Sequence, residues 1–242
     1  MASITKVDAG ELSGGNKAAL HRLRQFTLED LENLQEFSTI YCSGNEELMF
    51  PIIGELVIHN CPRVKFVPLP PTTQRLHISA CDQVMSSLPK TAEVGEHATG
   101  VEASSSTSMA SARVTQLVVE NCKVSLGDWS LLHHLPGLRT LEIWNCNDLT
   151  SSPDTIRVIS SLQTLCFKQC IGMTSLPEYL GDLTSIRQLI LDRCEGIQSL
   201  PQSIDKLSKL KVLGILECPE LKNWCELEGN KKKLAHIQII YE

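Results

Sequence analysis

VTQLVVENC at residues 114–122 is followed by LRTLEIWNC at 138–146, LQTLCFKQC at 162–170, IRQLILDRC at 186–194 and LKVLGILEC at 210–218. Each phrase places apolar residues at the same alternating positions and ends in a cysteine, so that the five cysteines follow one another every 24 residues. Apolar residues that alternate with variable ones indicate a half-buried strand. The chain is therefore built from a repeated unit of one strand and one return segment.

The shared form L-x-x-L-x-L-x-x-C is typical of leucine-rich repeats, in which each strand lies beside that of the next repeat. The return segments SLPEYLGDLTSI and SLPQSIDKLSKL turn at Pro177 and Pro201 and then place apolar residues at helical spacing. We expect an α/β fold: a leucine-rich-repeat solenoid with a concave parallel sheet and short helices or turns on its convex side.

The spacing of the strands is regular only in the second half of the chain. The third apolar position of each strand serves as a marker, and the markers are Leu28, Ile58, Ile78, Val119, Ile143, Phe167, Leu191, Ile215 and Ile239. Their spacings are 30, 20 and 41 residues, followed by five intervals of 24. The sequence predicts irregular leucine-rich repeats over 23–90 and repeats in strict 24-residue register over 114–242.

Two stretches lie outside this pattern. Residues 1–22 are mostly polar and lack an obvious cap, so the first repeat is expected to present an exposed edge formed by Leu20, Leu23, Phe26 and Leu28, as in the tail of a longer protein. Residues 91–113 include GEHATGVEASSSTSMASA, which has almost nothing to bury. We expect a passive, low-complexity disordered insertion there, with a phosphorylated regulatory loop as the alternative.

Composition disfavours several classes of function. The chain has 22 Lys and Arg residues against 28 Asp and Glu residues, a net charge of −6. No large positive field therefore favours nucleic acid or an anionic membrane. No apolar stretch has the length of a signal peptide or a membrane span. We expect a cytoplasmic or nuclear protein that binds neither nucleic acid nor membrane.

Seven cysteines share the position after a strand: Cys61, Cys81, Cys122, Cys146, Cys170, Cys194 and Cys218. Neighbouring strands place their Cα atoms about 4.8 Å apart, but parallel Cβ vectors leave the sulfurs badly placed for a disulfide. No Cys-x-x-Cys occurs, and parallel side chains do not converge on a zinc ion. We expect reduced structural thiols and no metal site. Cys166, at an outward strand position, has a reactive thiol as its alternative.

Catalytic and cofactor chemistry has little support in the sequence. Glu120 and Glu142 lie on adjacent predicted strands with Cα atoms about 8 Å apart, a separation that inverting glycosidases use. An open solenoid face, however, offers no enclosed pocket for a general acid. His133 and His134 fall on the convex return and are expected to be solvated, and SGGNK at 13–17 lacks the pattern of a phosphate-binding loop. We expect no enzyme, no catalytic residue and no cofactor.

The outward side of the strands is the candidate binding surface. One outward column reads Glu120, Trp144, Lys168, Asp192 and Leu216, and its neighbour reads Val118, Glu142, Cys166, Ile190 and Gly214. A basic edge runs through Arg139, Arg187 and Lys211. An exposed aromatic residue among charged residues and arginines is typical of protein-binding hot spots. We predict that a protein partner binds Glu120, Arg139, Glu142, Trp144, Lys168, Arg187, Ile190 and Asp192.

The 24-residue unit L-x-x-L-x-L-x-x-C-x-x-L-x-x-L-P, the return segments and the closing LKNWCELEGNKKKLAHIQIIYE resemble one known family from about Leu20 onward. They are similar to the C-terminal leucine-rich-repeat region of plant intracellular nucleotide-binding disease-resistance proteins. The resemblance implies binding of a pathogen effector or a guarded host protein, and autoinhibitory contact with a nucleotide-binding domain. The nucleotide-binding motifs of that family are absent from the 242 residues, so no nucleotide-binding residue carries over.

Three other classes of protein remain as alternatives. The substrate-binding repeat region of a ubiquitin ligase subunit also has cysteine at this repeat position, but 22 polar residues cannot supply the F-box helices that typically precede it. An extracellular enzyme-inhibiting repeat protein would show a signal peptide and a Gly-x-Ile-Pro return, and neither occurs. A carbohydrate hydrolase built on Glu120 and Glu142 is the enzyme alternative.

Overall fold

A computed structural model describes residues 4–7, 20–37, 40–41, 47–48, 52–65, 69–70, 72–86, 113–123, 129–146 and 159–241. The predicted insertion at 91–113 lies outside these residues except for Arg113. In the described part of the chain, none of the helices combines the length and the apolar character needed to cross a membrane.

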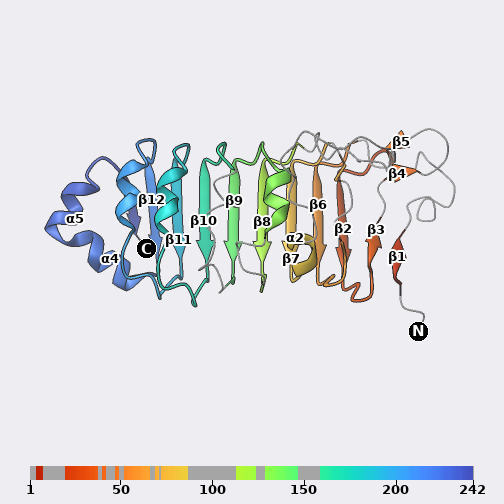
Figure 1. Ribbon diagram of the computed structural model, residues 1–242, viewed down its shortest axis with the longest axis horizontal. Helices are drawn as coiled ribbons and strands as arrows, with labels where there is room; N and C mark the ends of the chain where they lie inside the picture. Colours follow the sequence, from red (N-terminus) through yellow and green to blue (C-terminus); the bar gives the residue numbers. More distant parts are fainter. Residues whose placement is uncertain are drawn as a thin grey trace, which may run out of the picture.

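Nine strands form one parallel sheet whose spatial order follows the sequence (Figure 1). They are β2 (Gln25–Glu29), β6 (Glu55–His59), β7 (Arg75–Ser79), β8 (Gln116–Glu120), β9 (Thr140–Trp144), β10 (Thr164–Lys168), β11 (Gln188–Asp192), β12 (Val212–Leu216) and β13 (Gln238–Tyr241). Each strand contains one of the nine predicted markers. The nine predicted strands are confirmed, and they stack as a solenoid requires.

The register agrees with the sequence alignment as far as β12. From β2 to β12 the markers lie opposite one another in turn, although the first three spacings are irregular. The predicted position of the last marker is wrong, because Tyr241 would continue the line opposite Ile215 and Ile239 lies opposite Leu213. Two helices fill the return before β13, α4 (Pro219–Glu226) and α5 (Glu228–Lys233). This return is longer than 24-residue spacing allows, and it shifts β13 by two residues.

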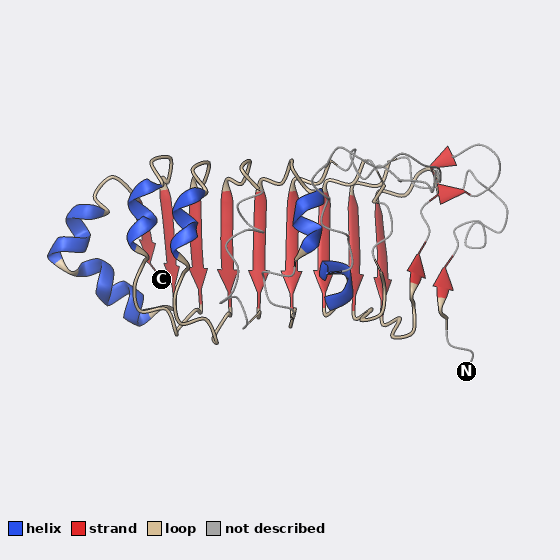
Figure 2. Ribbon diagram, viewed as in Figure 1, coloured by secondary structure: helices blue, strands red, loops and turns tan. Residues whose placement is uncertain are grey.

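The predicted short helices are confirmed on one face of the sheet (Figure 2). They are α2 (Asp82–Ser86) and the 3₁₀ helices η3 (Ser130–His134), η4 (Glu178–Asp182) and η5 (Gln202–Lys206). Pro177 and Pro201 precede η4 and η5 in extended conformation, so each proline turns the chain into its helix without losing a helical hydrogen bond. His133 and His134 lie in η3, on the predicted convex side.

One carboxylate links two neighbouring convex helices. The Glu178 side chain in η4 accepts hydrogen bonds from the backbone N–H groups of Gln202 and Ser203, each 2.9 Å long, at the start of η5. These N–H groups have no partner inside their own helix. The two bonds hold the pKa of Glu178 below its usual value. The side chain thus caps the helix of the next repeat.

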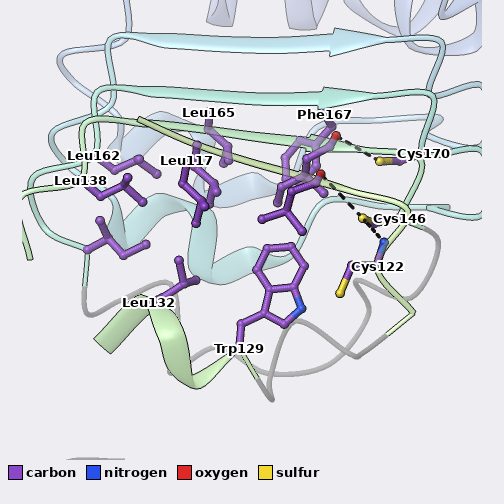
Figure 3. Packing of buried hydrophobic residues seen from close by; sticks show 14 of the residues in the cluster. Leu117, Cys122, Trp129, Leu132, Leu138, Cys146, Leu162, Leu165, Phe167 and Cys170 are labelled. Carbon is purple, nitrogen blue, oxygen red and sulfur yellow. Dashed lines mark hydrogen bonds between the residues drawn. The ribbon is translucent and has the colours of Figure 1, made fainter. Parts of the chain in front are cut away.

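The hydrophobic core lies between the sheet and the convex segments (Figure 3). The inward residues of the regular strands are almost completely buried, among them Leu117, Leu141 and Leu165 at 0–1% exposure. Trp129, also fully buried, stands two 24-residue units before Pro177, where later repeats have the proline. Truncating a buried side chain of this kind costs about 3–5 kcal/mol.

The cysteine column forms a ladder of backbone contacts at the ends of the strands (Figure 3). Cys146 Sγ accepts a hydrogen bond from the Cys122 N–H at 3.3 Å, and its thiol faces the carbonyl of Trp144, also at 3.3 Å. The same N–H to sulfur contact joins Cys194 to Cys218. The nine cysteines in the described ranges are free thiols, as predicted, and burial raises the pKa of Cys146 to about 12. The thiol of Cys146 therefore stays protonated at neutral pH, and the N–H to sulfur contacts join one repeat to the next.

A second column has left-handed backbone; its first member, Asp30, stands before Leu31, and each later member stands directly before a cysteine. Its members have φ between 49° and 56° and are Asp30, Asn60, Ala80, Asn121, Asn145, Gln169, Arg193 and Glu217. The turn lets the N–H of Asn145 reach the carbonyl of Lys168 on the next strand at 2.8 Å. Asparagine and aspartate tolerate this conformation best among residues with a side chain. The Asn-Cys pairs at 60–61, 121–122 and 145–146 indicate this left-handed turn, and the sequence analysis did not use them.

The N-terminal end of the solenoid is better covered than predicted. Beyond β2, β1 (Lys6–Val7) pairs in parallel with β3 (Glu36–Phe37), and Phe37 stacks on Phe26 with ring centroids 5.3 Å apart. Leu28 is only 3% exposed, so the predicted exposed edge is wrong for this residue. Leu20, Leu23 and Phe26 are partly buried against the core. A short antiparallel pair, β4 (Ile40–Tyr41) and β5 (Glu47–Leu48), follows β3.

Candidate binding face

The pleat of each strand decides which side chains leave the core. Successive side chains of a strand point to opposite sides, and in β8, β9, β10 and β11 the second and fourth residues are buried while the first, third and fifth are not. We call the surface formed by the first, third and fifth residues of the strands from β2 to β12, with Gln238 and Ile240 in β13, the concave face. Parallel register arranges these residues in columns that cross the sheet.

A row of interacting side chains crosses the concave face. This central row consists of His77, Glu120, Trp144, Lys168 and Asp192, one from each strand between β7 and β11. His77 Nε2 lies 3.4 Å from Glu120 Oε2, and Lys168 Nζ lies 3.6 Å from Asp192 Oδ2. Lys168 Nζ is also 5.3 Å from the centre of the Trp144 ring, which His77 meets edge-on with centroids 6.1 Å apart. The row is therefore one continuous network around Trp144.

Trp144 is the only aromatic residue among the first, third and fifth positions of β2 and β6–β12. Its side chain is half-buried, held between His77 and the ammonium group of Lys168. A cation over an indole ring contributes about 0.5–1 kcal/mol at an exposed site and more when water is excluded. Its Nε1 is shielded from solvent, and no described residue accepts a hydrogen bond from it. The indole is thus preorganised but keeps one unused donor.

The predicted binding residues fall into three places. Glu120, Trp144, Lys168 and Asp192 belong to the central row, and Glu142 and Ile190 occupy the neighbouring column, opposite Val118 and Gly214 respectively. Arg139 and Arg187 each lie one residue before a strand, are exposed, and stand at the edge of the face. The structure brings the first six together and leaves the two arginines at the rim. Their role in binding a partner stays a prediction.

His77 and Ser79 belong to the face but were missed from sequence. They lie opposite Val118 and Glu120, because β7 and β8 pair directly across the 41-residue gap between their markers. Ser79 is fully buried, and within the described part of the chain its Oγ has no hydrogen-bond partner. Reading the columns back through Ile78 would have found both residues.

The surroundings of Glu120, Glu142 and Cys166 bear on whether these residues could act as catalytic or reactive groups on this face. Glu120 pairs with His77, and Glu142 lies two residues out of step on the next strand, the offset that the sequence predicts. Burial, followed by the nearby carboxylates of Glu142 and Asp192, raises the pKa of Cys166 to about 12. A thiol that stays protonated at neutral pH is a poor nucleophile, so the raised pKa argues against the reactive-thiol alternative for Cys166. The described residues contain no cluster of three or more His, Cys, Asp or Glu side chains that could hold a metal ion.

No model of a protein family matches the sequence, and no curated protein matches it either. Solved structures do match. The leucine-rich-repeat domain of the type III effector XopL is similar over 93% of this chain and 71% of that one, with a TM-score of 0.59 and 21% sequence identity. This chain has a leucine-rich-repeat fold. The predicted fold class, an α/β leucine-rich-repeat solenoid, is confirmed.

Two further solved structures are similar to this chain. A leucine-rich-repeat protein of Leptospira interrogans is similar over 98% of this chain and 63% of that one, with a TM-score of 0.48 and 14% identity. The TLR13–ssRNA13 complex is similar over 85% of this chain and 34% of that one, with a TM-score of 0.43 and 14% identity. At these identities the likeness between the leucine-rich-repeat chains concerns the fold alone.

Proposed function

We propose that this leucine-rich-repeat chain is a protein-recognition module that binds a protein partner on its concave face. The observation that carries the proposal is the central row, in which Trp144 is fixed between His77 and Lys168 on the solvent side of the sheet. A held tryptophan gives a partner apolar area at little cost in side-chain entropy, and the surrounding charges orient the partner.

The size of the face supports a protein partner over a small molecule. Nine strands at about 4.8 Å spacing extend over roughly 40 Å, and five residues of strand extend over about 16 Å. The product is on the order of 600 Å², close to the area of about 800 Å² that each partner contributes to a standard protein interface. A small-molecule site would instead need concave enclosure of most of its ligand.

The more specific role that we propose is the ligand-sensing region of a plant intracellular immune receptor. The support is the resemblance of the 24-residue unit, its return segments and the closing segment to that family. In this role the concave face would bind a pathogen effector or a guarded host protein, or make autoinhibitory contact with a nucleotide-binding domain. The protein would act in the cytoplasm or the nucleus, in keeping with a ladder of reduced cysteines.

Affinity capture in plant cells tests both levels of the proposal. The chain is expressed as wild type, as Trp144→Ala and as Tyr179→Ala, and retained proteins are identified by mass spectrometry and rebound in purified form. Tyr179 is the matched control because it is an aromatic residue, also partly buried, but lies in η4 on the convex side. We expect Trp144→Ala to weaken binding of the purified partner by about 2 kcal/mol or more, and Tyr179→Ala to leave affinity unchanged.

The identity of the partner separates the alternatives. A nucleotide-binding domain, an effector or a host protein targeted by an effector supports the immune role. An adaptor of a ubiquitin ligase complex would replace that role by the substrate-binding alternative. Equal affinity of wild type and Trp144→Ala, combined with loss in Tyr179→Ala, would place recognition on the convex side. Hydrolysis of a glycoside panel that disappears in the Glu120→Ala, Glu142→Ala double variant would establish the enzyme alternative.

A further inference from the structure

One strand of the solenoid has no polar side chain on either side of the sheet. Strand β12 reads VLGIL, and its outward residues are Val212, Gly214 and Leu216. A continuous apolar run is typical of strands that are buried on both faces, whereas apolar and polar residues alternate in strands with one solvent-exposed face. Val212 and Leu216 are nevertheless partly exposed. The outward side of β12 therefore has the composition of a surface that is buried against another molecule or segment.

The neighbouring strands extend this apolar surface. Ile190 of β11 and Ile240 of β13 lie opposite Gly214 on its two sides, and Ile240 is 42% exposed. We call the set Ile190, Val212, Gly214, Leu216 and Ile240 the apolar patch. It adjoins the central row, which ends at Asp192 on β11, directly opposite Leu216.

Gly214 sets the shape of the apolar patch. A Cβ atom at this position would meet Cγ2 and Cγ1 of Ile190 at 3.3 Å and 3.4 Å, so the isoleucine leans across the glycine toward β12. Glycine inside a strand costs about 0.5–1 kcal/mol and often marks a place where another chain approaches closely. Here it lets Ile190 lie low over the sheet, and the patch gains continuous apolar area without a ridge.

A basic rim borders the apolar patch on one side. Arg187 and Lys211 are exposed and stand directly before β11 and β12, three residues from Ile190 and Gly214 respectively. Three residues of strand correspond to about 10 Å. Neither cation forms an ion pair with another described residue, whereas Asp192, at the far end of β11, is paired with Lys168. The apolar patch is therefore bordered by two positive charges, those of Arg187 and Lys211, that no described residue neutralises.

We propose that the apolar patch binds an extended segment of a partner protein that carries one large apolar side chain and a carboxylate about 10 Å from it. The apolar side chain covers Ile190, Gly214 and Leu216, and the carboxylate pairs with Arg187 and Lys211. The inference rests on the proposed function as a protein-recognition module and names the chemistry of the partner. Burial of the apolar side chain supplies most of the affinity, and the rim charges fix the direction of the segment.

A random peptide library displayed on phage and selected on the full chain provides the probe. We expect enriched peptides with Leu, Ile, Met or Phe three positions from Asp or Glu. Synthetic versions should lose about tenfold or more in affinity with Leu216→Glu and with the Arg187→Glu, Lys211→Glu pair. They should bind normally to Gln116→Glu, an exposed outward position on β8 that serves as the control. Thermal unfolding confirms that each variant is folded.

A charge swap keeps the test decisive if Leu216→Glu fails to fold. A peptide with Lys in place of its acidic residue should recover affinity for the Arg187→Glu, Lys211→Glu variant. Absence of selected peptides, peptides without acidic residues, or affinity insensitive to Leu216→Glu and to the charge swap would overturn the proposal. Peptides that depend on Trp144 and ignore Leu216 would overturn it while leaving concave-face recognition intact. Dimerisation of the wild type that Leu216→Glu abolishes would assign the patch to a second copy of the chain and overturn it as well.

Discussion

Replacing Gln169 by glycine should stabilise the protein. Gln169 follows β10 with φ of 54°, in the left-handed column that precedes the cysteines. A residue with a Cβ atom pays roughly 1–2 kcal/mol for this conformation, and glycine does not. Glycine also makes the unfolded chain more flexible, which costs about 0.4–1 kcal/mol. The backbone hydrogen bond from Gln169 N–H to the Asp192 carbonyl is retained. The expected net gain is therefore about 0.5–1 kcal/mol.

The matched control is the same substitution at Gln188, which is also exposed but lies in β11. There glycine relieves no left-handed backbone and should destabilise the protein by about 0.5–1 kcal/mol. Urea unfolding of the full chain at neutral pH measures both changes, with equal slopes required for comparison. If Gln169→Gly and Gln188→Gly destabilise equally, the left-handed column does not cost the folded protein what we infer.

Three further predictions concern the core, the convex caps and the thiols. Phe167→Ala should destabilise by about 3–5 kcal/mol, because Phe167 is 3% exposed, while Lys168→Ala on the opposite side of β10 should cost less than about 1 kcal/mol in urea unfolding. Glu178→Gln should lower the thermal midpoint at pH 7 and lower it less as the pH falls, because a carboxyl whose pKa is lowered on folding stabilises the folded chain when ionised and loses that effect as it is protonated. Burial raises the pKa of Cys146 from 9.0 to about 12, so its contribution to stability is present below pH 9 and lost toward pH 12; urea midpoints across this range should fall less in Cys146→Ala than in the wild type.

The repeat architecture was predictable because every strand has apolar residues at the same inward positions. Leucines that recur at fixed offsets must face one core, so markers such as Ile143 and Leu191 predict strands and their register without further information. The register of β13 was not predictable in this way, because α4 and α5 fill a longer return and the offset depends on how they pack. Ile239 and Tyr241 are both apolar and both fit the inward pattern, so the pattern alone does not choose between them.

The sequence predicts which residues belong to the candidate site, but it does not predict which of their side chains contact one another. Alternation places Trp144, Lys168 and Asp192 on the outward side whatever their rotamers are. The ammonium group over the indole and the pairing of Glu120 with His77 depend on side-chain torsions that no sequence pattern encodes. His77 stands one residue before the marker Ile78, and it was missed because the outward columns were read only from β8 onward, although β7 and β8 pair directly. The left-handed column was missed because Ala80, Gln169 and Arg193 occupy it without a recognisable preference.

The cysteine ladder also bears on how such a chain can change in length. The sulfurs of Cys146, Cys170, Cys194 and Cys218 contact backbone carbonyls of the preceding unit. The contact from Cys122 to Cys146 has the same form and the same 24-residue separation as that from Cys194 to Cys218. A recombination event that removes or duplicates one such unit brings together ends that already complement each other. The columns of the concave face can therefore become longer or shorter by whole units, while the thiol contacts, the left-handed turn and the strand register are inherited unchanged.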